Sequence, residues 1–199
     1  AGDHRALHSF PARRSSDLGE EELYINDETG SNPDRITPHW ILPGRSVTDL
    51  LWAYPGRIGA SILNKVYATT GGQHFDITRA AGDYTGTISN LWNGCVLGGL
   101  GYLNNGKDKP QIWKPMATGQ VLIDYPTAQW EIPSLSTPDG WRCKVLRSWK
   151  GYLIAMDTTE DGVAYEQRFR WSALGEVGAQ PVSWDHADPA VAAKYWDLQ

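Results

Sequence analysis

The chain has 199 residues, a formal net charge of -5, ten tryptophans and nine tyrosines. Its 21 glycines and 12 prolines interrupt the sequence too often for long helices, and the composition favours short strands joined by turns. Because the charge is modest and no basic cluster stands out, we expect no nucleic-acid partner. No apolar run approaches the ~20 residues of a membrane helix, and the first thirty residues lack a secretory signal, so we expect no membrane insertion.

The first eighteen residues differ from the rest of the chain. Residues 9–18 back-translate to a DNA sequence that resembles, but for one base, the adapter oligonucleotide of short-read sequencing. We therefore expect residues 1–18 to be a non-native, disordered segment and residues 19–199 to be the folded part, a metagenomic fragment of a longer protein. The alternative is a basic, serine-rich arm that contacts nucleic acid.

Helix signals are weak and short. Residues 46–54 could form two turns, because Ser46 is a plausible cap and Asp49 follows it three positions later. Residues 188–194 begin with Asp188 and Pro189, which are suited to start a short helix. Neither prediction changes the expected fold class.

A repeat is visible through the tryptophans. The segments from Trp92 and from Trp141 both fit Trp-x3-Val-Leu-x3/4-Gly-Tyr-Leu. Trp141 follows Trp92 by 49 residues, whereas the Gly-Tyr-Leu triplets are 50 residues apart, which indicates one inserted residue in the turn. A fainter copy covers residues 62–67. Strand repeats of ~40 to 50 residues are typical of propeller blades.

Each copy reads as a hairpin followed by a polar turn and further strands. The polar turns at residues 71–73, 104–108 and 158–162 lead to strands at 74–78, 111–113 and 169–171. We predict an all-β fold, a β-propeller-like repeat of antiparallel hairpins with three to four blades in an incomplete ring. The residues expected to be buried at equivalent positions are Trp92, Val96, Leu97 and Tyr102, and Trp141, Val145, Leu146 and Tyr152.

The outer strand of the last hairpin and the two cysteines carry further expectations. Alternation of Phe169 and Trp171 around Arg170 predicts a half-buried outer strand.

Cys95 and Cys143 differ in phase relative to the repeat, so their thiols should face opposite sides of the sheet and remain free and reduced.

Candidate chemistry is sparse in this sequence. The carboxylates that could form a glycosidase pair are Asp83, Asp124, Asp157 and Asp185, although most acidic residues here lie in turn-like sequence that solvation or turn capping explains. The five histidines show no metal-ligand spacing. We therefore predict no catalytic residue, no cofactor and no metal, so the chain is expected not to be an enzyme.

One binding site can be formulated from the aromatic residues. Trp113, Tyr125, Trp130 and Trp149 could form a stacking platform for sugar rings, because aromatic rings cover the apolar face of a pyranose. Core packing between blades explains most of them equally well. Residues 136–141 are similar to the Asp-box turn of sialidase-type propellers, but the Asp is one position late and the Thr is absent, so a plain turn is the better interpretation.

The stretch 36–198 resembles virion structural proteins of tailed phages, the large Trp-rich tail proteins with propeller-like domains. The segments that carry this resemblance are residues 38–44, 103–113, 151–156, 168–172 and 183–185. It implies a structural component of a phage tail or tail tip, located in the virion after assembly in the host cytoplasm. The implied partners are other tail proteins, further copies of the chain and host-surface glycans. The alternative is a glycan-binding or glycan-processing β-propeller of the sialidase or glycosidase kind.

Overall fold

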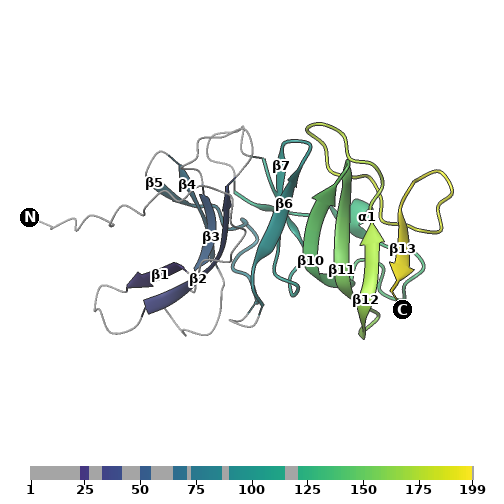
Figure 1. Cartoon of the computed structure of the whole chain (residues 1–199), viewed down its shortest axis with the longest axis horizontal. Coiled ribbons are helices and arrows are strands. Elements are labelled where there is room, and N and C mark those ends of the chain that lie inside the picture. Colours follow the sequence, from purple (N-terminus) through teal and green to yellow (C-terminus); the bar gives the residue numbers. More distant parts are fainter. Residues whose placement is uncertain are drawn as a thin grey trace, which may run out of the picture.

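The computed structural model describes residues 23–26, 33–41, 50–54, 65–70, 73–86, 90–114 and 121–198 (Figure 1). The strands before residue 77 are described by their backbone, with side chains only at Lys65, Val66 and Asp76. Residues 1–18, whose native origin the sequence puts in question, lie outside this part.

In the described part of the chain, thirteen strands form three antiparallel sheets in chain order. The first sheet contains β1 (Leu23–Asn26), β2 (Pro33–Ile41), β3 (Leu50–Tyr54), β4 (Lys65–Thr70) and β5 (Gln73–Asp76). The second contains β6 (Asn93–Leu97), β7 (Leu100–Asn104), β8 (Gln111–Trp113) and β9 (Ile123–Asp124). The third contains β10 (Arg142–Trp149), β11 (Tyr152–Glu160), β12 (Val163–Trp171) and β13 (Lys194–Asp197). The sheets follow one another along the long axis of the molecule (Figure 1).

The all-β, propeller-like class is therefore confirmed, and no closed ring is formed by the described residues. Both helix predictions were wrong. Residues 50–54 form strand β3, and Asp188 accepts a hydrogen bond from the backbone N–H of Ala190 in a single turn. The one helix of the described part is the four-residue α1 (Thr127–Trp130), which begins after Pro126 and which the sequence reading missed.

Three hairpins close through two-residue turns in which both residues have positive φ. These residues are Gly98 and Gly99, Lys150 and Gly151, and Asp161 and Gly162. Such turns match the right-handed twist of the strands that they join. Turn chemistry local to the sequence thus determines where the strands of the second and third sheets reverse.

The two copies of the repeat share their starts but differ in hairpin length. Trp92 and Trp141 are both buried and directly precede the first strand of their sheets. However, Tyr102 pairs with Cys95, whereas Tyr152 pairs with Trp149 at the tip of a longer hairpin. The Gly-Tyr-Leu triplets are therefore not equivalent in register, and the prediction of a single inserted residue was wrong.

Residues at equivalent positions of β6 and β10, the first strands of the two hairpins, are buried to a similar degree. Leu97 and Leu146 are buried, while Val96 and Val145 are half-buried. On the second strands Tyr102 is buried and Tyr152 is half-buried. The expected burial is thus confirmed for the tryptophans, the leucines and Tyr102. It was wrong for Val96, Val145 and Tyr152.

A tryptophan cluster forms the core between the second and third sheets. Trp130 and Trp141 stack with ring centroids 3.9 Å apart, and Trp184 packs edge-on against both. The indole N–H of Trp141 donates to the carbonyl of Trp130 at 2.7 Å, and that of Trp130 donates to the carbonyl of Trp141 at 3.3 Å. This core joins α1, the start of β10 and the loop before β13.

Asparagines of the second sheet bind the backbone of β10. Asn93 accepts a hydrogen bond from the N–H of Leu146 at 2.9 Å and donates to the carbonyl of Lys144 at 2.7 Å. Asn104 donates to the carbonyl of Cys143 at 2.9 Å. Because β10 lies at the edge of its sheet, these side chains pair polar backbone groups that have no neighbouring strand.

Both cysteines are free, as expected. Each belongs to a different sheet, and both pack into the core between the second and third sheets. Opposite faces of two stacked sheets meet at the same interface, so thiols of opposite phase both point into it. Burial raises the pKa of Cys95 to about 12 and raises that of Cys143 as well, which makes both thiols unreactive.

Candidate functional site

The four aromatic residues expected to stack on sugars do not form one platform. Trp113, Tyr125 and Trp130 are at most 7% exposed, so their faces are covered by protein. Trp149 alone is open, at 60% exposure, with the ammonium group of Lys150 4.7 Å from its ring centroid. The alternative of core packing is therefore correct for three of the four residues.

The four candidate carboxylates are held separately by neighbours in the fold. Asp83 pairs with Lys65 at 2.6 Å, and Asp157 pairs with Lys144 at 2.7 Å. Asp185 accepts a hydrogen bond from the backbone N–H of Ala187 in a turn. The remaining candidate, Asp124, belongs to a larger polar cluster.

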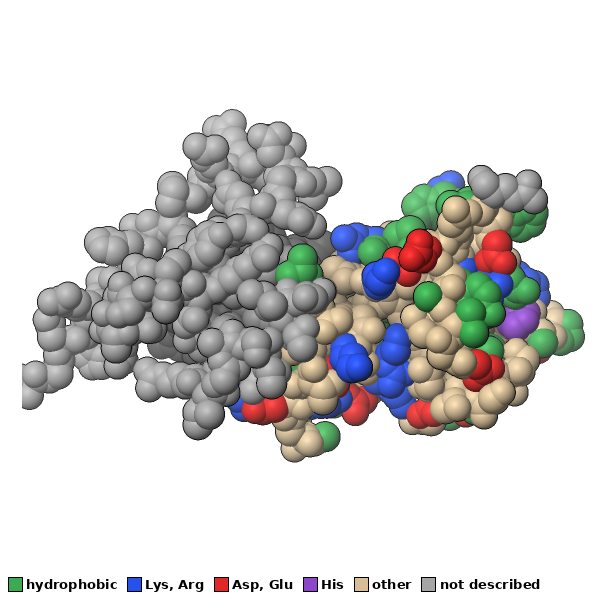
Figure 2. Space-filling model, turned by 90° about the horizontal axis from the view of Figure 1, so that it is seen from below, with side chains coloured by type: hydrophobic (Ala, Val, Ile, Leu, Met, Phe, Trp, Pro, Cys, Tyr) green, Lys and Arg blue, Asp and Glu red, His purple; other side chains and the backbone are tan. Residues whose placement is uncertain are grey.

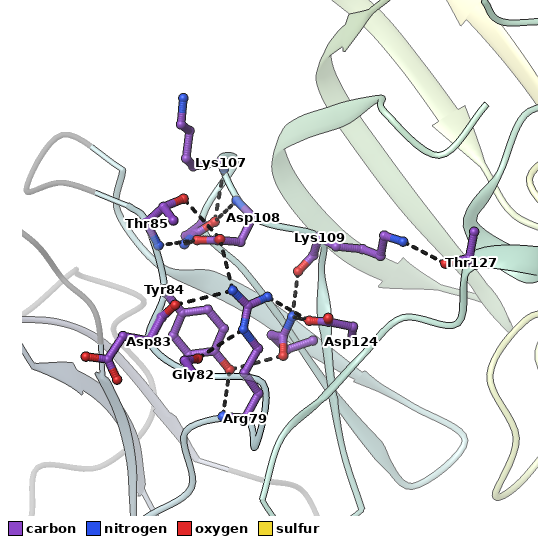
Figure 3. A network of polar contacts seen from close by, with 12 residues as sticks. Arg79, Gly82, Asp83, Tyr84, Thr85, Lys107, Asp108, Lys109, Asp124 and Thr127 are labelled. Carbon is purple, nitrogen blue, oxygen red and sulfur yellow. Dashed lines mark hydrogen bonds and ion pairs between the residues drawn. The ribbon is translucent and has the colours of Figure 1, made fainter. Parts of the chain in front are cut away.

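That cluster is centred on Arg79, in the loop after β5 (Figure 3). Its guanidinium binds Asp124 on β9 at 2.9 Å and Asp108 in the β7–β8 loop at 3.4 Å. It also donates to the backbone carbonyls of Gly82 and Asp83, and it lies 4.7 Å from the centroid of the Tyr84 ring. Arg79 thus joins three segments that are far apart in the sequence.

Asp108 is the buried end of this cluster. It accepts hydrogen bonds from the backbone and hydroxyl of Thr85, at 2.9 and 3.1 Å, and from the side chain of Asn105 at 2.9 Å. Asn105 in turn accepts from the backbone N–H groups of Lys107 and Asp108. The polar turn predicted at residues 104–108 is therefore an internal hydrogen-bonded loop that holds a carboxylate against Arg79.

The electrostatics of the cluster fit a structural role. Burial would raise the pKa of Asp124, but hydrogen bonds from Gln111 and Arg79 outweigh it, and the pKa is lowered. The carboxylate is therefore ionised at neutral pH and bound to a cation, which makes it a poor proton donor or acceptor.

A second polar cluster lies on the third sheet and is more deeply buried. Glu160 and Arg170 are 3% and 2% exposed and form a two-pronged pair, with N···O distances of 2.7 and 2.6 Å. Arg168 donates to the same carboxylate at 2.9 Å and pairs with Asp197 through two further hydrogen bonds of 2.7 Å. Thr158 completes the set by donating to Glu160 at 2.7 Å.

The expectation of a half-buried outer strand at residues 169–171 is confirmed for the burial of Phe169 and Trp171, but β12 is not the outer strand, because it lies between β11 and β13. Arg170 faces the tryptophan core, 6.0 Å from the Trp141 ring centroid, while its neighbours Phe169 and Trp171 are half-buried on the other face. A buried arginine requires a partner charge. Glu160 supplies that charge from the adjacent strand.

A hollow of about 210 Å³ opens beside the second cluster. Its walls include Arg168, Arg170, Tyr165, Tyr195 and His186. The guanidinium of Arg168 lies 3.9 and 4.4 Å from the centroids of the two tyrosine rings. The tyrosines and Asp197 thus surround Arg168, whose three nitrogens all donate to carboxylates.

Proton chemistry in this hollow is disfavoured. Burial would raise the pKa of Glu160, but hydrogen bonds from Arg170 and Thr158 together with the positive charges outweigh it, and the pKa is lowered. Burial and the charge of Arg170 lower the pKa of His186. Glu160 is thus fixed as an anion and His186 is mostly neutral at pH 7.

Among the described residues, no group of three or more His, Cys, Asp or Glu side chains could hold a metal ion. No helix of the described part is long and apolar enough to cross a membrane.

Residues 136–141 lie in a turn between α1 and β10, where Asp161 accepts hydrogen bonds from the backbone of Ser136 and Thr137, so the plain-turn interpretation is confirmed.

Sequence reasoning missed both polar clusters. For the second one a signal existed, because Asp161-Gly162 is a strong turn sequence that places Glu160 near the strand carrying Arg170. Arg79 gave no such signal, because its partners lie 29 and 45 residues further along the chain.

No protein-family model matches the chain, and no curated protein matches it significantly.

Proposed function

We propose that this protein is a structural assembly component that acts through packing contacts between β-sheets. The observation that carries the proposal is that aromatic and charged side chains of the described part hold its strands and loops together. The tryptophan core joins two sheets and a loop, and the Arg79 and Glu160 clusters tie strands and loops together.

The proposal extends to a place in a phage tail or tail tip. Support for this step is the resemblance of residues 36–198 to Trp-rich tail proteins. The buried aromatic content agrees with such a role, because packed aromatic side chains hold the second and third sheets together.

Glycan binding is the alternative outcome of the same experiments. It would rest on Trp149, the one member of the expected platform with an open ring. A single ring contributes little affinity unless polar groups beside it bind the sugar hydroxyls.

The test is to locate the chain in virions. Particles of a phage that carries this gene would be purified, their tails separated from capsids, and the peptides of each fraction identified by mass spectrometry. We expect the chain in the tail fraction at a fixed copy number per particle. Its absence from particles, together with binding or hydrolysis of a defined glycan by the purified protein, would overturn the proposal.

A further inference from the structure

The third sheet carries an apolar row on the face opposite the tryptophan core. Register pairs join Val145 to Met156, Met156 to Phe169 and Phe169 to Trp196, so the row crosses all four strands. Residues paired in this way share a face of the sheet. This set of four residues is called the outer row below.

The adjacent row shows that the outer row faces away from the core. Leu146 pairs with Ala155, Ala155 with Arg170, and Arg170 with Tyr195. Leu146 and Ala155 belong to the buried core cluster. Because successive residues of a strand point to opposite faces, the outer row lies on the other side.

The outer row is accessible. Trp196 is 62% exposed, and the other three members are half-buried. Phe169 also stacks on Trp171, with ring centroids 5.6 Å apart, which extends the apolar surface toward the next row. Figure 2 shows from another side that hydrophobic side chains remain exposed on the C-terminal part of the molecule.

Unequal charges flank the outer row at its two ends. The next row along the strands is Arg147, Ile154, Trp171 and Lys194. Within the described part both cations bind neutral groups: Arg147 donates to the side chain of Asn93 and the carbonyl of Leu146, and Lys194 donates to the carbonyl of His186. At the opposite end lies Asp157, paired to Lys144. The hydrogen bond and charge of Asp157, with a smaller contribution from the charge of Glu166, raise the pKa of Lys144, and Glu166 on β12 is exposed.

We propose that the outer face of the third sheet binds the same face of a second copy of this chain. Across a two-fold axis lying between the sheets and perpendicular to the strands, the outer rows pack together. The same rotation brings Lys194 on β13 of one copy toward Glu166 on the adjacent strand, β12, of the other. The face is therefore complementary to itself in both apolar surface and charge, as an isologous dimer requires.

The mode of packing already occurs within one chain. The second and third sheets pack through apolar residues of opposite faces, with Leu97 and Tyr102 on one side and Leu146 and Leu153 on the other. The second copy would cover the outer face of the third sheet as the second sheet covers its inner face. This inference rests on the proposed assembly role and names one partner and one surface for it.

The first experiment measures mass in solution with the full chain. Size-exclusion chromatography with light scattering at 1 to 100 µM should show a dimer. Trp196→Glu should weaken its affinity at least about thirtyfold, because the substitution places a charge where the most exposed aromatic residue of the outer row packs against the second copy. The matched control is Val177→Glu, at a residue that is 93% exposed in a loop, which should leave the dimer unchanged. Far-UV circular dichroism verifies that each variant is folded.

A charge exchange tests the orientation of the two copies. Lys194→Glu and Glu166→Lys should each weaken the dimer several-fold, and the double variant should restore most of the affinity, because the opposite charges still meet. A monomer at 100 µM, an assembly larger than a dimer, or a dimer that Val177→Glu disrupts and Trp196→Glu does not, would overturn the inference. A monomer that is still found in phage tails would leave the proposed function standing, whereas a dimer that is absent from virions would refute that function alone.

Discussion

Replacing Trp141 by alanine should remove the central element of the core between the second and third sheets. The side chain is fully buried and stacks on Trp130 at 3.9 Å between ring centroids. Loss of a buried tryptophan typically costs about 3 to 5 kcal/mol in the free energy of unfolding. The substitution also leaves the carbonyl of Trp130 without the 2.7 Å hydrogen bond, which adds about 1 to 3 kcal/mol.

The total expected loss is therefore at least about 4 kcal/mol, a large part of the ~5 to 15 kcal/mol by which a domain is stable. Urea unfolding followed by far-UV circular dichroism measures it without depending on tryptophan emission, which the substitution itself alters. Trp141→Phe helps to separate the two contributions, because it keeps an aromatic ring in the core but removes the indole N–H together with the second ring.

The matched control is Trp149→Ala, at a tryptophan that is 60% exposed. It should change the free energy of unfolding by no more than about 0.5 kcal/mol. If Trp141→Ala cost no more than this control, the tryptophan cluster would not be the core of the fold, and the packing argument would be refuted.

Three further predictions concern buried polar groups. Glu160→Gln should cost about 3 to 5 kcal/mol in urea unfolding, because it leaves Arg170 buried and unpaired, and adding Arg170→Met should recover part of that loss. The pKa of Glu160 in the folded protein lies below its ordinary value of 4.5. The stability that this group contributes is therefore complete above pH 4.5 and is lost as the pH falls through the lowered pKa. Chemical unfolding between pH 6 and 2 should show this loss, and Glu160→Gln should give a flatter profile. Cys95 and Cys143 should react with a disulfide reagent at least about a hundredfold more slowly in the native protein than in urea, because burial raises both pKa values; equal rates would contradict their placement.

The hairpins of the second and third sheets were largely predictable because their determinants are local. Gly98-Gly99 and Asp161-Gly162 allow positive φ at both turn residues, and the strands that flank them are rich in aliphatic and aromatic residues. Hairpin length was not predictable in the same way. Tyr102 and Tyr152 occur in identical triplets, but the turn of the second hairpin, at Lys150 and Gly151, includes the first residue of its triplet, whereas the first hairpin turns at Gly98 and Gly99, before its triplet, so the registers differ.

The face to which a residue points depends on partners that the local pattern does not contain. Arg170 lies between two aromatic residues, so alternation alone places the arginine outside and the rings inside. The structure reverses this, because Glu160 neutralises the arginine on the core side. The Arg79 cluster was equally hidden, since its carboxylates come from other loops of the chain.

The reversal of β12 explains why the aromatic residues do not form a sugar-binding platform and why a partner surface arises instead. With Arg170 turned inward, Phe169 and Trp171 are placed on the outer face, where Phe169 is in register with Met156 and Trp196. The third sheet thus has two apolar faces, as a sheet inside a stack does, and the tryptophan core covers one of them. A sheet of this kind is stable in water only if the second face is small or is covered by another sheet. The charge arrangement around the outer row favours cover by a second copy of the chain, and this makes the exposed Trp196 a sharper test of assembly than any residue of the expected sugar site.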